Sequence, residues 1–372
     1  MSCSSRRIAS NYLAHRGELI ANPVVELSDD GTILSVESYE PHQLDRLEST
    51  EHYSGVMVAG MVNAHCHLEL SYLRGVIPPH CGFAGFAAGM STNRTLFSDQ
   101  ERLSAIYSAD REMQRGGVVA VADILNGDSS YVVKSDSAIE YCNFAELFGL
   151  RSVDTSAIDG LLKYPSTYPT PHSLYSLNDE VLKDVVSIGD APLSIHFMES
   201  EGEGELFHRR GVLYEWFERV GFECDFLHYD SPAHRLISLV PPERSVMLIH
   251  NCCVTQHDID LIMNHFTAPV YWVICPRSNS YISGLKPPVD LLRRNNLTIC
   301  VGTDSLASNS SLSLLDELKS IDSTATLAEQ LMWVTANGAS ALSLPHLGDI
   351  EVGKRPGINI ISPTGYTLRS IP

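Results

Sequence analysis

Short apolar runs alternate with amphipathic stretches along the middle of the chain. The apolar runs occupy residues 56–62, 118–122, 193–197, 246–249, 270–274 and 298–301. Segments with a helical spacing of apolar positions lie between them, at residues 99–115, 178–188, 206–220 and 313–320. Buried strands that alternate with helices predict an α/β fold with a parallel sheet and right-handed crossovers. The length of this region favours a closed (β/α)8 barrel of the TIM type over an open sheet.

Both ends of the chain have a different pattern, in which short β-type stretches are separated by turn residues. These stretches occupy residues 19–25, 33–38, 348–353 and 359–361. Such segments predict strands joined by tight turns. We therefore expect one small β-sandwich domain built from residues 1–55 and 346–372, with residues 56–345 as the barrel.

Potential metal ligands stand at the ends of four of the apolar runs. They are His65 and His67 after the first run, followed by His196, His250 and Asp304. The carboxyl ends of barrel strands meet at one face, so these side chains are expected to converge. His65 and His67 are two residues apart, which directs both side chains to the same side of an extended segment. Imidazole nitrogens with one carboxylate suit zinc or ferrous iron and argue against calcium or magnesium.

The order of these motifs resembles the amidohydrolase superfamily, in particular its branch of metal-dependent nucleobase and nucleoside deaminases and chlorohydrolases. The matching segments are GMVNAHCHLELS at 60–71, HFME at 196–199, HNC at 250–252, CPRSN at 275–279, GTDSLASNSS at 302–311 and GDIEVGKRP at 348–356. Within that branch the chain is similar to S-adenosylhomocysteine and adenosine-type deaminases and to aminodeoxyfutalosine deaminases. The resemblance spans about residues 18–361 and implies the same barrel with a β-sandwich made from both termini.

The resemblance implies a role for each residue of these motifs. It implies four ligands for a divalent ion, His65, His67, His196 and Asp304. Glu199 corresponds to the carboxyl group that passes a proton to a ring nitrogen, and His250 to the residue that positions and deprotonates the attacking water. Asp304 is implied in proton transfer as well as in binding the ion. A further set is implied near the substrate or in support of the ligands: His172, Glu69, Ser278 and Asn279.

We expect one ion per chain, zinc or alternatively iron. Binuclear members of the superfamily carry a carboxylated lysine at the end of the fourth strand, and no lysine of this chain follows a predicted strand in that region. The implied reaction is removal of an amino group from a heterocycle of purine or purine-nucleoside type by an ion-activated water. Two alternatives stay open, hydrolysis of a ring amide or carbon–halogen bond, and a metal-binding scaffold without turnover. Glu199 and His250 argue against the scaffold, which needs no proton shuttle.

Other contacts to the substrate are less specified by the sequence. His172, in the segment PHSLY, resembles the H-S-x-Y segment near the substrate in relatives, although a hydrogen-bonded structural histidine is the alternative. Arg74 and Arg94 are candidate contacts to an anionic substrate group. Residues 77–90, rich in Pro, Gly and Phe, are expected to form a pocket wall or a lid.

Composition and charge exclude several classes of partner. The formal net charge is −19, and the densest basic stretches are Arg pairs, so we expect no nucleic-acid partner. No apolar stretch reaches the length of a membrane span, and the first residues lack a signal-peptide core, which predicts a cytoplasmic protein that binds no membrane. The nine cysteines form no disulfide framework or CxxC pair. The expected partner is a small heterocyclic substrate, and the sequence leaves a homodimer open.

Overall fold

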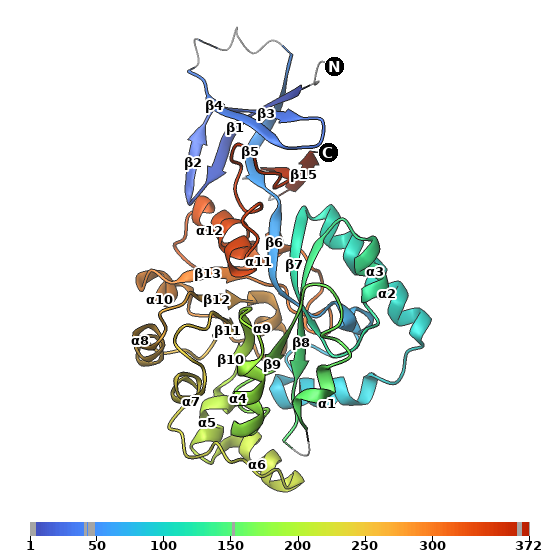
Figure 1. The fold of residues 1–372 in the computed structure, drawn as a ribbon, viewed down its shortest axis with the longest axis vertical. Helices are drawn as coiled ribbons and strands as arrows, with labels where there is room; N and C mark the ends of the chain where they lie inside the picture. The colour runs from blue at the N-terminus through green and yellow to red at the C-terminus, as the bar shows by residue number, and fades with distance from the viewer. Residues whose placement is uncertain (1–4, 41–42, 44–48, 151–152, 363–366, 372) are drawn as a thin grey trace.

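Strands from both ends of the chain join in one sheet. The computed structural model describes residues 5–40, 43, 49–150, 153–362 and 367–371. Both termini lie at the same β-rich end of the molecule (Figure 1). The strands there are β1 (Ser5–His15), β2 (Glu18–Ala21), β3 (Pro23–Ser28), β4 (Ile33–Ser38), β5 (Thr50–Ala59), β14 (Ile358–Ser362) and β15 (Thr367–Ile371). Their order is β15-β14-β5-β1-β3-β4, with β2 paired to β1.

The junction between the two ends is the antiparallel pair of β14 and β5. Ile358 lies opposite Ala59, and Ile361 opposite Val56. The expected strand at 19–25 is divided at Asn22, which has a positive φ of 50°. The expected strand at 348–353 was wrong: this segment is a loop in which Gly348 and Gly353 have φ values of 86° and 85°. Two such left-handed residues turn the chain and prevent an extended ladder.

The middle of the chain forms two parallel sheets of four strands each, which confirms the predicted α/β class. The first sheet contains β6 (Met61–Cys66), β7 (Val118–Leu125), β8 (Glu140–Leu147) and β9 (Thr167–Pro171), and the second contains β10 (Leu193–Phe197), β11 (Val246–His250), β12 (Val270–Ile274) and β13 (Thr298–Val301). Isolated parallel bridges join Cys66 with Asp304 and Ser173 with His196, between the edges of the two sheets.

Gly60 separates the terminal sheet from the parallel sheets. The apolar run at 56–62 is therefore two strands, because β5 ends at Ala59 and β6 begins at Met61 in a different sheet. A Cβ at Gly60 would lie 2.3 Å from Val119 Cγ1 and 2.5 Å from the Pro356 carbonyl oxygen. Only glycine fits this crossing without displacing a neighbour. The expected domain boundary at residues 55 and 56 falls inside β5.

Helices alternate with the parallel strands and cover them (Figure 1). They are α1 (Gly82–Asn93), α2 (Asp99–Arg115), α3 (Tyr131–Asp136), α4 (Asp179–Ser187), α5 (Glu201–Phe207), α6 (Gly211–Val220), α7 (Pro232–Leu239), α8 (Gln256–His265), α9 (Pro276–Ser283), α10 (Val289–Arg294), α11 (Leu314–Ser320), α12 (Leu327–Trp333) and α13 (Ala336–Ala341), with the 3-10 helices η2 (Leu68–Leu73) and η3 (Thr155–Ile158). The predicted helix at 206–220 was wrong in its bounds: the chain breaks between α5 and α6, where Arg209 has a φ of 55°.

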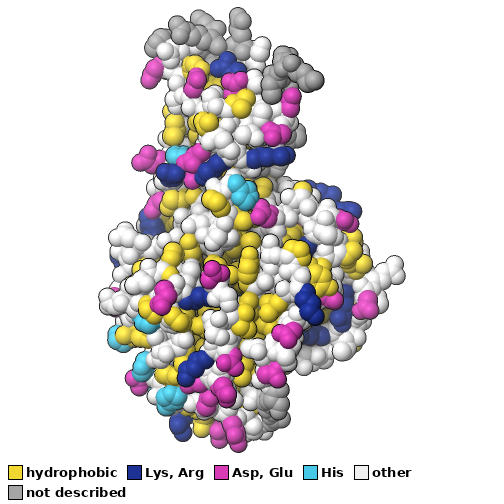
Figure 2. Space-filling model, viewed as in Figure 1, with side chains coloured by type: hydrophobic (Ala, Val, Ile, Leu, Met, Phe, Trp, Pro, Cys, Tyr) yellow, Lys and Arg dark blue, Asp and Glu magenta, His cyan; other side chains and the backbone are white. Residues whose placement is uncertain are grey.

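Charged side chains of both signs lie on the face of the molecule drawn in Figure 2. Figure 2 shows acidic side chains spread over that face, with Lys and Arg scattered among them. Among the described residues, none of the helices is both long enough and apolar enough to span a bilayer. The cysteines of the described part of the chain are free, and Cys3 lies outside it.

Candidate metal centre and active site

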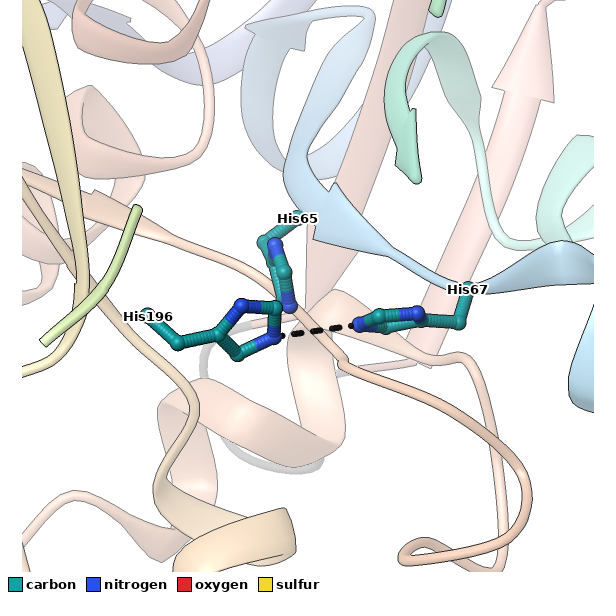
Figure 3. Close-up of side chains that lie close together, drawn as sticks. All are labelled: His65, His67 and His196. Atoms are coloured by element: carbon teal, nitrogen blue, oxygen red, sulfur yellow. Dashed lines mark hydrogen bonds between the residues drawn. The ribbon is translucent and has the colours of Figure 1, made fainter. Parts of the chain in front are cut away.

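Three strand ends, far apart in the sequence, bring the four expected ligands together. His65 lies in β6 and His67 directly follows it, His196 lies in β10, and Asp304 follows β13. Ligand nitrogens of the three histidines lie within 4.8 Å of one another. Figure 3 shows the three imidazole rings turned toward a common point, with His67 Nε2 and His196 Nε2 3.3 Å apart. Asp304 Oδ1 lies 3.8 Å from His65 Nε2 and 3.6 Å from His67 Nε2.

Hydrogen bonds hold the Gly-Thr-Asp segment at residues 302–304 close against β6. This close approach explains why the segment begins with glycine. Backbone N–H groups of Thr303 and Asp304 both donate to the His65 carbonyl, at 3.0 and 3.1 Å. The Asn63 amide donates to Thr303 Oγ1 at 2.7 Å. A Cβ at Gly302 would lie 2.7 Å from His65 Cβ, so a side chain there would push the two strand ends apart.

The donor set fits a transition metal. Both ring nitrogens of His65 are buried and have no hydrogen-bond partner, an arrangement that costs free energy unless a ligand satisfies them. Burial lowers the pKa of His65 and His196 well below the usual value, and neighbouring histidines lower it further, so both rings are neutral with lone pairs available. The His196 Nδ1–H donates to the His172 carbonyl at 2.9 Å, which leaves Nε2 for the ion.

Asp304 is held as a carboxylate by its surroundings. Although burial opposes its charge, His67 and His250 hold its pKa below the usual value. Ser278 Oγ donates to Asp304 Oδ2 at 2.5 Å, and Ser308 Oγ donates to the same oxygen at 2.7 Å. Ser278 therefore supports the expected ligand and does not line the pocket described below.

Glu199 and His250 lie beside this cluster. His250 Nε2 is 3.7 Å from Glu199 Oε1, and His250 Nδ1 contacts the Asn279 amide at 3.0 Å. Burial and, to a smaller extent, the charge of Asp304 raise the pKa of Glu199 to about 8, so Glu199 carries a proton at neutral pH. A buried carboxyl group with such a pKa can both donate and accept protons near pH 7.

The backbone around these groups is strained. Met198, His250, Asn251 and Asp304 have positive φ values of 49°, 77°, 59° and 55°. Each such residue costs about 1–3 kcal/mol and persists only where its surroundings enforce it. At Asn251 the side-chain amide holds the backbone in this conformation. It donates to backbone carbonyls of β11 and β12 at 2.7 and 3.0 Å.

Two acidic residues of the site were not found from the sequence. Glu203 accepts the backbone N–H groups of Met198 and Glu199 at 2.9 and 2.7 Å, and so fixes the segment that carries Glu199. Glu146 Oε1 accepts the His172 Nδ1–H at 2.6 Å and raises the pKa of His172 against the effect of burial. Glu146, His172 and His196 form a second group close enough to hold an ion. Glu146 lies near the end of strand β8. A polar residue at the end of a strand is the same signal that identified the other residues.

Glu69 and Lys134 lie away from the ion-binding cluster. Glu69 Oε2 accepts the backbone N–H of Asn126 at 3.1 Å, and burial raises the pKa of Glu69 to about 7. Lys134 Nζ is paired with Asp123 at 2.5 Å and donates to Asn143 at 2.7 Å. Asp123 also accepts the backbone N–H of Leu68, the residue after His67, at 2.7 Å.

One pocket of about 800 Å³ opens onto the cluster. Its polar wall includes His67, His172, His196, Glu199, His250 and Asp304. Arg94 also lines the pocket, whereas Arg74 lies outside it and pairs with Glu112 on the surface. Neither Glu69 nor Asn279 lines it. The expected wall at residues 77–90 corresponds in part to α1, whose residues Phe83, Phe86 and Met90 face this space.

Known proteins are similar to this chain over most of its length. A curated relative is the 5-methylthioadenosine/S-adenosylhomocysteine deaminase of Halalkalibacterium halodurans, 27% identical, with a match that covers 90% of this chain and 79% of the relative. Helicobacter pylori aminofutalosine deaminase, solved with methylthio-coformycin, superimposes with a TM-score of 0.81 at 22% identity over 96% of this chain and 92% of that chain. Xanthomonas campestris adenosine deaminase with bound zinc gives 0.74 at 22% identity over 96% and 85%.

The two structural likenesses establish that this chain has the same fold as those two proteins. The family model for the amidohydrolase family matches residues 163–371, more than half of the chain. The matched region contains His196, Glu199, His250 and Asp304, and the segment with His65 and His67 lies before it. The chain therefore belongs to the amidohydrolase family.

Proposed function

We propose that this protein is a metal-dependent deaminase of an amino-substituted heterocycle of purine or purine-nucleoside type. The observation that carries the proposal is the position of Glu199 and His250 beside a cluster of three histidines and one aspartate, in one pocket. A binding scaffold has no use for a carboxyl group and an imidazole 3.7 Å apart that both face the pocket beside the expected ligands. Relatives named as adenosine or methylthioadenosine/S-adenosylhomocysteine deaminases support the reaction class.

We propose one ion per chain, held by His65, His67, His196 and Asp304, with zinc as the metal and iron as the alternative. Imidazole nitrogens and a carboxylate oxygen are among the usual ligands of catalytic zinc, which keeps a further position for water or substrate. The zinc-bound adenosine deaminase of Xanthomonas campestris supports the choice. Lys134 is engaged with Asp123, so it is not available as a bridge between two ions.

The residues around the ion would then carry out the proton transfers. When bound, a divalent ion lowers the pKa of a water molecule toward neutrality and so supplies the nucleophile. His250 Nε2 would accept a proton from the attacking water, provided that Nδ1 is protonated. The buried Asn279 Oδ1, which has no partner, supplies an acceptor for this Nδ1–H once the amide is rotated. Glu199 would give its proton to the ring nitrogen next to the reacting carbon and regain the one taken up by His250, and Asp304 and Glu199 would relay the remaining proton of the added hydroxyl group to the leaving amino group, which departs as ammonia.

We further propose that the two parallel sheets close into one eight-stranded barrel. The bridges Cys66–Asp304 and Ser173–His196 join the sheet edges, and the His196 N–H donates to the His172 carbonyl at 2.9 Å. Closure at these two seams would hold His67, His196 and Asp304 at fixed separation. That is what an ion with short, directional bonds requires.

The reaction is tested by ammonia release. Purified protein loaded with zinc should release ammonia from one or more members of a panel of aminopurines, aminopyrimidines and their nucleosides. A coupled glutamate dehydrogenase assay measures the ammonia, and loss of the amino group appears as an ultraviolet shift of the ring. Release of chloride from halogenated rings, or ring opening of cyclic amides, without ammonia from any amine would overturn the proposal in favour of another hydrolase.

We also propose that the two ends of the chain, residues 1–55 and 346–372, fold together as one β-sandwich domain. Deleting residues 357–372 removes β14 and exposes the β5 edge, together with the contacts of Ile358, Ile360 and Ile361, each worth about 1.5–3 kcal/mol when buried. We expect an insoluble product. Deleting only residues 367–372, which removes the outer strand β15, is the milder control. A soluble, active product of the larger deletion would contradict the domain assignment.

A further inference from the structure

A buried lysine lies beside the ion-binding cluster, and the proposed reaction does not use it. Lys134 of α3 has its Nζ 2.5 Å from Asp123 Oδ2, and it donates to Asn143 Oδ1 at 2.7 Å. Asp123 and Asn143 are partners in the register of β7 and β8. The rings of Tyr131 and Tyr141 lie 5.2 Å from the same Nζ. The side chains of Lys134 and Asp123 are 5% and 0% exposed, so this ion pair is removed from water.

Stability alone does not account for such a pair. The cost of taking two charges out of water offsets much of their attraction, and apolar side chains of similar volume often serve the fold as well. An apolar pair cannot, however, supply a hydrogen-bond acceptor at a fixed position. Asp123 supplies one, because its Oδ1 accepts the backbone N–H of Leu68 at 2.7 Å. Each oxygen of Asp123 thus has its own partner, Lys134 on one side and the chain next to His67 on the other.

The hydrogen bond from Leu68 is made where His67 leaves β6. The 3-10 helix η2 begins at Leu68, and the first N–H groups of a helix have no partner inside it. The His67 side chain does not cap η2, because its ring is turned toward the other histidines (Figure 3). Asp123 lies opposite Cys66 in the register of β6 and β7, and it provides the acceptor from the neighbouring strand. The backbone on both sides of His67 is therefore tied to β7.

A second hydrogen bond joins the same two segments in the opposite direction. Glu69 of η2 accepts the backbone N–H of Asn126, the residue after β7, at 3.1 Å. Two acidic side chains, Asp123 and Glu69, thus lie in one buried contact. Lys134 attracts both of them, which offsets the repulsion between their charges. The lysine is therefore the group that allows a carboxylate to serve as the acceptor for η2.

We propose that Asp123 and Lys134 form a positioning pair for His67, which holds this ligand in place before the ion binds. Lys134 engages one oxygen of Asp123, so that the other faces the Leu68 N–H. A ligand that is already ordered loses less conformational freedom on binding, which increases the affinity for the ion. Neither residue lines the pocket, so the pair acts through His67 and does not touch the substrate. This inference rests on the proposed ligand set.

Two double variants separate the acceptor from the charges. Changing Lys134 alone would leave the Asp123 carboxylate buried and unpaired, which destabilises a fold strongly, so both residues are changed together. Asp123→Asn with Lys134→Met removes both charges and keeps an acceptor oxygen for the Leu68 N–H. Asp123→Leu with Lys134→Met removes both charges and the acceptor at similar volume. The net charge of the protein is the same in both variants and in wild type.

Zinc affinity and the cobalt spectrum are the readouts. Competition with a chromophoric chelator should give a zinc dissociation constant within about threefold of wild type for the asparagine variant. The leucine variant should bind zinc about 10–100-fold more weakly, as is usual when a supporting contact of a ligand is lost. The visible absorption bands of the cobalt-loaded protein should be unchanged in the first variant and altered in the second. Circular dichroism and thermal unfolding of the metal-free proteins check that both variants fold.

Tyr141→Phe is a matched control in the same region. It removes the hydroxyl group that donates to Asp110 at 2.7 Å and keeps the ring beside Lys134. A buried hydrogen bond is lost, while the contact between Asp123 and Leu68 stays intact. We expect the zinc affinity and the cobalt spectrum of this variant to equal those of wild type.

Hydrogen–deuterium exchange tests the pair in wild type, where folding of a variant is not in question. The Leu68 amide should exchange as slowly in the metal-free protein as in the zinc-loaded protein, because Asp123 holds it in both. In the Asp123→Leu double variant this amide should exchange faster. An amide that is fast in metal-free wild type and slow only with zinc would show that the ion itself orders the segment, which overturns the proposal.

The remaining outcomes distinguish the pair from the ligand set. Wild type that binds no zinc contradicts the proposed ligand set itself. If wild type binds zinc, equal affinities in the two double variants overturn the positioning pair alone. A loss of affinity in Tyr141→Phe as large as in the leucine variant overturns it too, because any buried contact of this region would then have the same effect.

Discussion

Replacing Glu199 with glutamine is expected to lower turnover by about 10²–10⁴, equivalent to about 3–5 kcal/mol of activation free energy. Glutamine keeps the size and most hydrogen bonds of the side chain but cannot carry the proton. The ion should be retained at the wild-type level, since Glu199 is not among the proposed ligands. Turnover by ammonia release and bound zinc by elemental analysis check the two parts separately.

The acidic sequence around Glu199 offers a matched control. Glu201 lies two residues further along the chain, on the exposed side of α5, and its replacement by glutamine makes the same chemical change outside the pocket. We expect Glu201→Gln to keep turnover within about twofold, as is usual for surface substitutions. Equal rates in Glu199→Gln and wild type would show that Glu199 is only a buried acid of the loop. A loss of zinc in Glu199→Gln would instead place this carboxyl group among the ligands.

The cluster of proposed ligands was accessible from the sequence because each of its residues stands at or just after the end of an apolar run. His65, His67 and His196 converge as the parallel strands predict, and the sequence separation is irrelevant once the strand ends share a face. The predicted parallel α/β fold follows from the same alternation. These predictions were possible because a buried strand appears in the sequence as a run of apolar residues. Against such a run, a polar residue at the strand end is easy to recognise.

Elements with weak local signals were missed. Strand β8 contains Asn143 and Glu146, which interrupt its apolar pattern, and β9 contains Pro169 and Pro171. In β8 and β9, pairing with neighbouring strands overrides the low strand preference of these residues. A local sequence pattern does not show which strands will pair. Because β8 was missed, Glu146 was missed too, and with it the acid that orients His172.

Residues on the loops and on α1 could not be assigned for a different reason. Arg74 and Arg94 were equivalent candidates in the sequence, yet one pairs with Glu112 at the surface and the other faces the pocket. The difference depends on how η2, α1 and α2 pack, which involves contacts with distant segments. The residues of such a pocket wall can be assigned only from the three-dimensional structure, whereas proposed ligands at strand ends can be assigned from the sequence.

The two possible ion positions give opposite predictions for two histidine variants. His196 belongs to both groups that could hold an ion, one with His65 and His67 and the other with Glu146 and His172. The proposed centre predicts that wild type binds about one zinc per chain. His65→Ala, which removes a nitrogen that has no other partner, should weaken zinc binding by more than about 100-fold, beyond the effect of losing a supporting contact. His172→Ala should keep the ion.

The activities of these variants should separate in the same way. His65→Ala loses the ion and therefore the source of the nucleophile, so turnover should fall by at least about 10³-fold and recover only in part with excess zinc. His172→Ala keeps the ion and loses a side chain of the pocket wall, so its defect should be smaller and appear mainly in KM. Zinc titration with a chromophoric chelator, circular dichroism to check folding, and ammonia release would be measured on both variants. If His172→Ala loses zinc while His65→Ala retains it, the ion occupies the Glu146 group, and the proposed ligand set is wrong. Two zinc ions in wild type would equally contradict a mononuclear centre, because the second group would then be a binding site of its own.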